Sequence, residues 1–136
     1  MQAYLFDSLA DKRVQCKLCH HRCVIKNGKR GICQVRQNND GTLVSLVYGK
    51  VVAQHVDPIE KKPLFHFLPG SQILSFGTLG CTLGCLFCQN WSHSHPRTAD
   101  AGIPWVGPAE VVTLAKQKGI PAISYTYNEP TVFGEY

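Results

Sequence analysis

Two groups of cysteines constrain this sequence of 136 residues more than any other feature. Four thiols lie near the start, and three more fall within the uncharged stretch "GCTLGCLFCQN", residues 80–90. In order, the cysteines are Cys16, Cys19, Cys23, Cys33, Cys81, Cys85 and Cys88. A framework of disulfides would leave one of these seven thiols over. Because cysteines clustered in a reducing compartment usually bind metals, the two groups predict two metal sites.

The second group offers three thiols and no fourth cysteine. Structural zinc needs four protein ligands in a closed tetrahedron, whereas each iron of a four-iron cube needs one outer ligand. Three cysteines would therefore ligate three irons and leave the last iron open to a small molecule. In the alternative, His93 or His95 would complete a Cys3His zinc site, because both imidazoles follow the triplet closely.

The first group offers four thiols, which is enough for a closed site. Structural zinc and an auxiliary iron-sulfur cluster both suit that count, and the sequence does not separate them. His20 and His21 are spare candidate ligands. The loop over residues 16–33 has few apolar side chains, so we expect a metal to hold it together.

Hydrophobic patterning before the triplet predicts a small antiparallel β meander. Residues 33–37, 42–48 and 50–56 have the pattern of three short strands. Asn39-Asp40-Gly41 supplies a hairpin turn between the first two.

A βαβ unit is predicted around and after the triplet. Residues 72–78 have the pattern of a buried strand, and residues 121–127 of another. Between them lies a helix with Pro108 near its first position and Gly119 at its end. The two strands should be parallel, with a right-handed crossover. Since function gathers at the carboxyl ends of parallel strands, the triplet and "YNEP", residues 127–130, should converge.

Composition favours a globular, cytoplasmic protein. The chain is 44% hydrophobic, which excludes a disordered chain, and it has neither a secretory signal nor an apolar run of membrane-spanning length. Residues 12–36 carry eight Lys or Arg and no acidic residue. A basic face that balances a thiolate-metal centre is the favoured explanation, and nucleic acid is a less favoured partner. A zinc- or cluster-stapled module that binds nucleic acid, or a simple electron carrier, are the alternative functions.

The triplet resembles a known signature. Cys81-Thr-Leu-Gly-Cys85-Leu-Phe-Cys88 resembles the CxxxCxxC motif of radical S-adenosylmethionine (SAM) enzymes, including the aromatic Phe87 before the last cysteine. The wider pattern, "PIEKKPLFHFLPGS" and "SFGTLGCTLGCLFCQNW" with "YTYNEPT" downstream, is similar to the pyruvate formate-lyase activating-enzyme-like branch. It is most similar to the radical SAM enzyme of the AmmeMemoRadiSam system, and the resemblance covers nearly the whole chain.

The resemblance implies a chemistry and a set of contacts. The triplet would ligate a 4Fe-4S cluster whose fourth iron is chelated by SAM, and reductive cleavage would give a 5'-deoxyadenosyl radical that abstracts hydrogen from a substrate. A partner protein is one candidate substrate, and an electron donor is a further expected partner; no membrane is expected. Phe87, through its backbone, Asn128 and Glu129 would contact SAM. Here the family's Gly-Gly-Glu motif is replaced by Tyr127-Asn128-Glu129.

The resemblance also implies a fold class. We expect an α/β protein: the start of a radical SAM partial (βα) barrel, with one βαβ unit, preceded by a small Cys-rich module and an antiparallel β meander. Residues 1–72 would hold the module, the meander and a connector, and residues 73–136 the beginning of the core domain. Because a barrel needs more units than one, we expect an amino-terminal fragment that has little or no turnover by itself.

Overall fold

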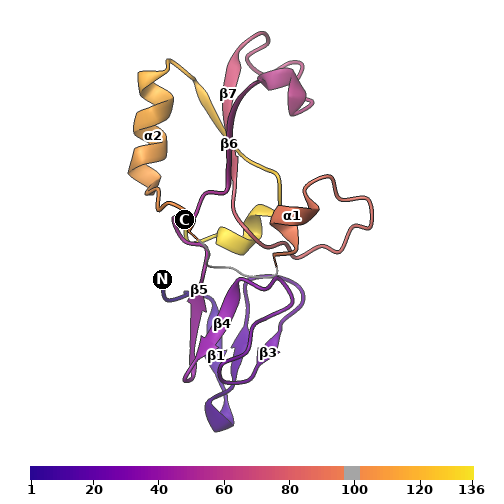
Figure 1. The fold of residues 1–136 in the computed structure, drawn as a ribbon, viewed down its shortest axis with the longest axis vertical. Helices are drawn as coiled ribbons and strands as arrows, with labels where there is room; N and C mark the ends of the chain where they lie inside the picture. Colours follow the sequence, from indigo (N-terminus) through magenta and orange to yellow (C-terminus); the bar gives the residue numbers. More distant parts are fainter. Residues whose placement is uncertain (97–101) are drawn as a thin grey trace.

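Short strands and brief helices make up the chain in this computed structural model, which describes residues 1–96 and 102–136 (Figure 1). The strands are β1 (Phe6–Ser8), β2 (Val14–Cys16), β3 (Val24–Ile25), β4 (Arg36–Asn39), β5 (Thr42–Ser45), β6 (Ala53–Pro58), β7 (Gln72–Gly77) and β8 (Ala122–Tyr125). The α-helices are α1 (Trp91–Ser94) and α2 (Pro108–Gln117), and the 3-10 helices are η1 (Ala10–Lys12), η2 (Ile59–Lys61) and η3 (Pro130–Phe133).

The strands form three small sheets arranged in two lobes. The lower lobe in Figure 1 contains the antiparallel sheets β1-β2-β3 and β4-β5. The upper lobe contains β6-β7-β8, in which β6 is antiparallel and β8 parallel to the central β7. The triplet loop and η3 lie between the lobes, so the candidate site is at their junction (Figure 1).

The predicted meander is right in its hairpin and wrong in its third strand. β4 and β5 pair through a two-residue turn in which Asp40 and Gly41 have φ of 52° and 87°, as a type I′ turn requires. β6 does not join this hairpin, because it pairs with β7 in the other lobe. The chain turns away at Gly49, where φ is 73° and an added Cβ would lie 2.2 Å from Trp105 Nε1. Alternating apolar residues identify a strand without identifying its partner.

The helix predicted between the last two strands is confirmed as α2. It begins at Pro108, and the Glu110 carboxylate accepts a 2.6 Å hydrogen bond from the Gly107 N–H. It ends before Gly119, whose φ of 64° is typical of a helix C-terminus. Val111 and Ala115 are buried on the face toward the sheet, so the helix covers the parallel pair β7-β8.

The prediction of a partial (βα) barrel is wrong for the described residues. The described strands form small, mostly antiparallel sheets, and β7-β8 is the one parallel pair among them. A barrel needs a succession of parallel strands, each followed by a helix. Here antiparallel β6 occupies the other side of β7, so the sheet is mixed. The strand and helix patterns around the triplet specify a single βαβ unit. They do not specify the further units that a barrel would need.

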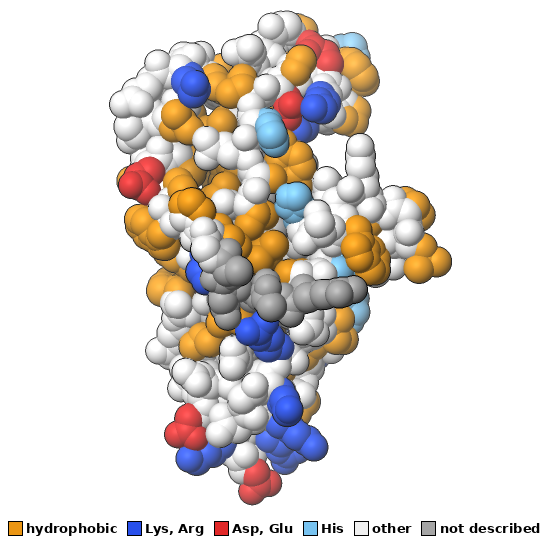
Figure 2. All heavy atoms as spheres, in the orientation of Figure 1, with side chains coloured by type: hydrophobic (Ala, Val, Ile, Leu, Met, Phe, Trp, Pro, Cys, Tyr) orange, Lys and Arg blue, Asp and Glu red, His pale blue; other side chains and the backbone are white. Residues whose placement is uncertain are grey.

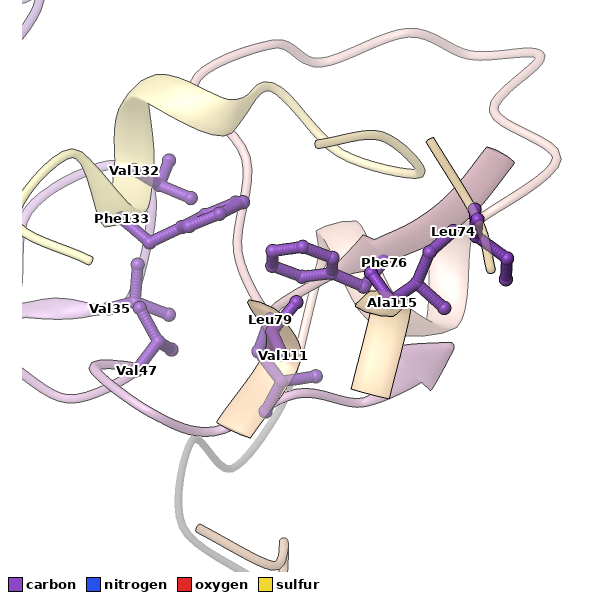
Figure 3. Packing of buried hydrophobic residues seen from close by; sticks show 10 residues of the cluster. Val35, Val47, Leu74, Phe76, Leu79, Val111, Ala115, Val132 and Phe133 are labelled. Atoms are coloured by element: carbon purple, nitrogen blue, oxygen red, sulfur yellow. The ribbon is translucent and has the colours of Figure 1, made fainter. Parts of the chain in front are cut away.

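Two hydrophobic clusters form the core: one connects the two lobes and the other lies within the lower lobe. The larger one joins β7, α2 and η3 to Val35 and Val47, at the end of the lower lobe that faces the upper lobe (Figure 3). Its buried members are Val35, Val47, Leu74, Phe76, Leu79, Val111, Ala115, Ile120, Val132 and Phe133. The smaller one lies within the lower lobe and consists of Ala3, Val14, Cys16, Ile25 and Leu43. Within the described part of the chain, neither helix has the length and apolar character that crossing a membrane requires.

Candidate functional site

The parallel pairing of β7 and β8 brings the segments that follow them together. The register runs from Ile73 opposite Ala122 to Phe76 opposite Tyr125, so both strands end at the same edge. Gly77 permits the close approach, because an added Cβ would lie 2.3 Å from the Thr126 carbonyl oxygen. The predicted convergence of the triplet with residues 127–130 is therefore confirmed.

Asn128 ties the two segments to each other. Its amide Nδ2 donates a 2.6 Å hydrogen bond to the Gly80 carbonyl oxygen, and its Oδ1 accepts a 3.3 Å bond from the Thr78 N–H. The root of the triplet loop is thus fixed to the end of β8. The sequence predicted only that Asn128 contacts the cofactor. The structure shows that Asn128 also forms hydrogen bonds with the triplet loop.

Tyr127 has a backbone conformation that is typical of glycine. Its φ of 71° lies in the left-handed region that glycine adopts easily and tyrosine rarely. The ring is held by its surroundings, since Lys62 Nζ lies 5.4 Å from the ring centroid and the His55 ring packs edge-on at 5.9 Å. Lys62 is in turn paired with the buried Asp57 at 3.0 Å. Tyr127 therefore adopts a left-handed backbone conformation although it is not glycine.

Three thiols and a carboxylate line one pocket at this junction. The pocket has a volume of about 310 Å³. Its lining residues are Cys81, Leu83, Cys85, Cys88, Asn90, Ser94, His95, Tyr127, Asn128 and Glu129. The structure thus brings the triplet and both predicted cofactor contacts of residues 128–129 to a single surface.

Backbone amides point at the first thiol of the triplet. Cys81 Sγ accepts hydrogen bonds from the Glu129 N–H at 3.4 Å and from the Leu83 N–H at 3.5 Å. Such bonds offset negative charge on a sulfur that ligates a metal. The Glu129 carboxylate Oε1 accepts from the Thr131 N–H at 3.1 Å and so caps η3. Glu129 therefore contributes its backbone to the thiol and its side chain to the pocket wall.

The remaining predicted residues around the triplet differ in position. Phe87 is 91% exposed and does not line the pocket. His95 does line it, with its ring stacked on Trp91 at 3.8 Å, whereas His93 is not part of the lining. Within residues 1–96 and 102–136, no three His, Cys, Asp or Glu side chains are arranged to hold a metal ion as they stand.

The four thiols of the first group line a second, much smaller cavity. Its volume is about 10 Å³. Its lining residues are Cys16, Leu18, Cys19, His21, Cys23, Ile25, Gly31, Ile32, Cys33, Arg36, Thr82 and Val132. Burial raises the pKa of the Cys16 and Cys33 thiols, and the charge of Arg36 opposes part of that rise. None of the seven cysteines is in a disulfide, and His21, unlike His20, is on the cavity wall.

The small cavity and the triplet loop are in direct contact. His21 Nε2 donates to the Thr82 carbonyl oxygen at 2.8 Å, and Thr82 lines the small cavity while Cys81 lines the large one. Gly80 rests on the same module, because an added Cβ would lie 2.6 Å from the Cys33 carbonyl oxygen. The two thiol-lined sites therefore share a wall.

A buried ion pair closes the small cavity from the other side, and no pattern in the sequence indicated it. Arg36 Nη1 and Nη2 donate to the Glu135 carboxylate at 2.5 Å, and Nη2 also donates to the Val132 carbonyl oxygen. Both side chains are almost fully buried. Their separation of 99 residues explains why local patterns do not reveal the pair. Asn90, which donates to the Tyr127 carbonyl oxygen at 3.0 Å, was missed for the same reason.

A curated archaeal protein is similar to nearly the whole chain. The chain is 44% identical over 135 residues to the uncharacterized protein MJ0808 of Methanocaldococcus jannaschii. The match covers 99% of this chain and 40% of that protein, so the chain spans less than half the length of the relative. No family model and no solved structure matches the chain.

Proposed function

We propose that the chain is part of a radical SAM enzyme, in which the large pocket holds a 4Fe-4S cluster together with SAM. The observation that carries the proposal is that Cys81, Cys85 and Cys88 line one pocket of about 310 Å³ with Glu129. Three thiols facing a wide pocket suit a cluster with one iron left for an exchangeable ligand. When bound, the cluster and SAM supply reductive cleavage to methionine and a 5'-deoxyadenosyl radical that abstracts hydrogen from a substrate.

The residues present fit these groups in number and in kind. The three thiols are free, they face the same pocket, and two backbone amides point at Cys81 Sγ. Their side chains would rotate toward the cluster on binding, since they do not stand as a preformed metal site among the described residues. A volume of about 310 Å³ leaves room for a ligand larger than a single ion.

Each remaining pocket residue has a role that follows from its contacts. Glu129 offers a carboxylate to the amino group of SAM, while its own N–H bonds to Cys81 Sγ at 3.4 Å. Asn128 positions the loop through its 2.6 Å bond to the Gly80 carbonyl oxygen and so holds Cys81 beside Glu129. For Phe87, which is exposed and does not line the pocket, a backbone contact with the adenine rests on the resemblance alone.

The partners of the proposed enzyme follow from the same chemistry. An electron donor must reduce the cluster, and the hydrogen donor is a further molecule, for which we propose a partner protein. The rest of a full-length chain, comparable in length with the relative that this chain covers to 40%, would supply further substrate contacts. We therefore expect this chain alone to have little turnover. A cytoplasmic location belongs to the proposal, because thiols that bind metals are kept reduced there.

The basic run is less suited to nucleic acid than its sequence indicates. Figure 2 shows Lys and Arg side chains on the lower lobe with acidic side chains beside them. Lys12 pairs with Asp40 at 2.7 Å, Lys17 pairs with Asp7, and Arg36 pairs with Glu135. Charges that are neutralised in this way release fewer counterions from a polyanion, which weakens such binding.

The test is anaerobic reconstitution of a full-length chain with iron and sulfide. We expect about four irons at the triplet, a change in the spin-resonance signal of the reduced cluster on adding SAM, and SAM-dependent release of 5'-deoxyadenosine. Glu129→Gln should weaken SAM binding, and the exposed Ser92→Ala variant on α1 serves as a control that leaves it unchanged. A cluster whose signal does not respond to SAM would indicate an electron carrier and overturn the proposal. Zinc alone, with salt-sensitive binding of polyanions, would favour the nucleic-acid module.

A further inference from the structure

We propose that the small cavity binds a single zinc ion through Cys16, Cys19, Cys23 and Cys33, and not a second iron-sulfur cluster. The four thiols converge on this cavity from the end of β2, the loop before β3 and the segment before β4. This zinc site goes beyond the function proposed above and does not depend on it, because none of the triplet cysteines takes part.

The size of the cavity favours a single ion over a cluster. Its volume of about 10 Å³ is roughly the space that one water molecule occupies. A single ion fits such a space, whereas a cube of four irons and four sulfides does not. Zinc is the ion of choice for four thiolates in a closed tetrahedron, with sulfur ligands about 2.3 Å from the metal. The wide pocket of the triplet, at about 310 Å³, shows that this chain provides more room where a larger group is proposed.

The charge around the cavity suits a tetrathiolate ion. Four thiolates around Zn²⁺ carry a net charge of about −2, and this charge needs compensation where water is excluded. The Arg36 guanidinium lines the cavity and is 1% exposed. Lys17 and Arg22 lie within the same loop, and Arg22 Nη1 donates to the Lys17 carbonyl oxygen at 3.3 Å. Arg36 is the one Lys or Arg residue of the run 12–36 in the cavity lining, and it also pairs with Glu135.

The lower lobe also has little else to hold it together. Its own cluster of buried residues has five members, one of which is Cys16. Small modules of this kind are commonly stabilised by a structural metal. The thiols do not stand as a ready-made tetrahedron among the described residues, so rotation of their side chains into the shared cavity would complete the ligand set.

The decisive experiment uses the triple variant Cys81→Ala, Cys85→Ala, Cys88→Ala, which leaves only the first group of thiols. After anaerobic purification and exposure to Zn²⁺, we expect about one zinc per chain, and Co²⁺ in its place should give the intense sulfur-to-metal absorption of four thiolates. Offered iron and sulfide, the variant should take up less than about one iron. About four irons with sulfide would overturn the proposal, and so would a folded variant that retains no metal.

A second measurement covers the case in which the triple variant does not fold. In the unmodified chain, Zn²⁺ should slow alkylation of the first four cysteines at least tenfold, as mapped by mass spectrometry, while those of the triplet stay reactive. Cys16→Ser with Cys19→Ser should abolish this protection, and Ser92→Ala should leave it intact. Equal reactivity of all seven thiols with and without Zn²⁺ would contradict the proposal.

Discussion

The two thiol-lined regions of this chain use the same side chain in opposite surroundings. Four cysteines enclose a cavity of about 10 Å³, and the buried Arg36 forms part of its wall. The three cysteines of the triplet instead line a pocket of about 310 Å³ and lie on a loop with exposed residues between them. Leu86 and Phe87, between the last two thiols, are 96% and 91% exposed. The two regions therefore differ in how far their thiols are enclosed, and not in the presence of cysteine.

The origin of the contrast lies in the elements that present the thiols. Short antiparallel strands turn back on themselves and close the small cavity from several sides. The triplet instead follows β7 of a parallel pair, where the chain leaves the sheet edge and remains open to ligands. The two regions share a wall but no cysteine, so substitutions of single thiols test whether they are separate sites.

Removing one thiol of the triplet should have the largest effect. Cys81→Ala in a reconstituted full-length chain should lower the iron content from about four per chain to below about one and reduce SAM cleavage to background. The zinc content should stay at about one, since Cys81 does not line the small cavity. Both metals are measured in the same sample by mass spectrometry. Loss of both metals together would show that the two regions are not separate sites.

Removing zinc should destabilise the chain without abolishing the triplet pocket. Zinc present at a thousand times its dissociation constant stabilises a folded chain by about 4 kcal/mol, and a chelator removes that contribution. Thermal unfolding followed by circular dichroism, with and without chelator, measures the difference. In the Cys16→Ser variant the chelator should have no further effect. An unchanged melting temperature in the parent chain would contradict a structural role.

Breaking the buried ion pair beside the small cavity should lower the stability of the chain. Glu135→Gln leaves the Arg36 charge buried without its partner, and we expect a loss of about 3 kcal/mol in the free energy of unfolding. The exposed pair of Lys12 and Asp40 is the matched control, because Asp40→Asn should cost less than about 1 kcal/mol. Urea unfolding measures both variants. Equal losses of stability in the two variants would mean that burial does not strengthen the Arg36–Glu135 pair.

The same pair predicts a dependence of stability on pH. Burial alone would raise the pKa of Glu135, but the hydrogen bonds and charge of Arg36 outweigh burial, so the pKa lies below its usual value of 4.5. A carboxylate whose pKa is lowered by folding stabilises the folded chain above the unfolded pKa, and this contribution is lost as the pH falls through the folded pKa. As the pH is lowered from neutral into this acid range, Glu135→Gln should therefore lose less stability than the parent chain, as urea unfolding at each pH would measure.

Loosening the shared wall should have the smallest effect. His21→Ala removes the 2.8 Å hydrogen bond to the Thr82 carbonyl oxygen, and we expect a loss of about 1 kcal/mol in stability. Cys81 should then be alkylated faster than in the parent chain, because the root of the triplet loop is less restrained. His20→Ala is the control, since that ring is tilted against His21 with centroids 4.0 Å apart and does not line the cavity. Identical alkylation rates of Cys81 in the two variants would show that the His21–Thr82 hydrogen bond does not restrain the triplet loop.

Local signals in the sequence predicted the elements that place the triplet. Pro108 and Gly119 marked the ends of α2, and Asp40-Gly41 marked the hairpin turn, because each depends on the conformational preference of the residue itself. The convergence of residues 81 and 129 was also predictable, since parallel strands end at one edge.

Long-range pairings were not predictable in the same way. The partner of β6 depends on where the chain turns at Gly49 and on the packing of Trp105, and neither appears in the alternation of β6. The Arg36–Glu135 pair joins residues 99 positions apart. The barrel prediction failed for this reason, because a strand-helix-strand pattern specifies one parallel pair and says nothing of the strand on the other side.

Gly80 has a consequence for anyone who would graft the triplet onto another scaffold. The loop rests on the carbonyl oxygen of Cys33 through a residue that has no side chain to adjust, so it cannot be transplanted as a peptide of three cysteines. The smallest portable unit comprises β7, the loop, β8 with Asn128 after it, and the stretch of the lower lobe that carries Cys33 and Val35 beneath the loop.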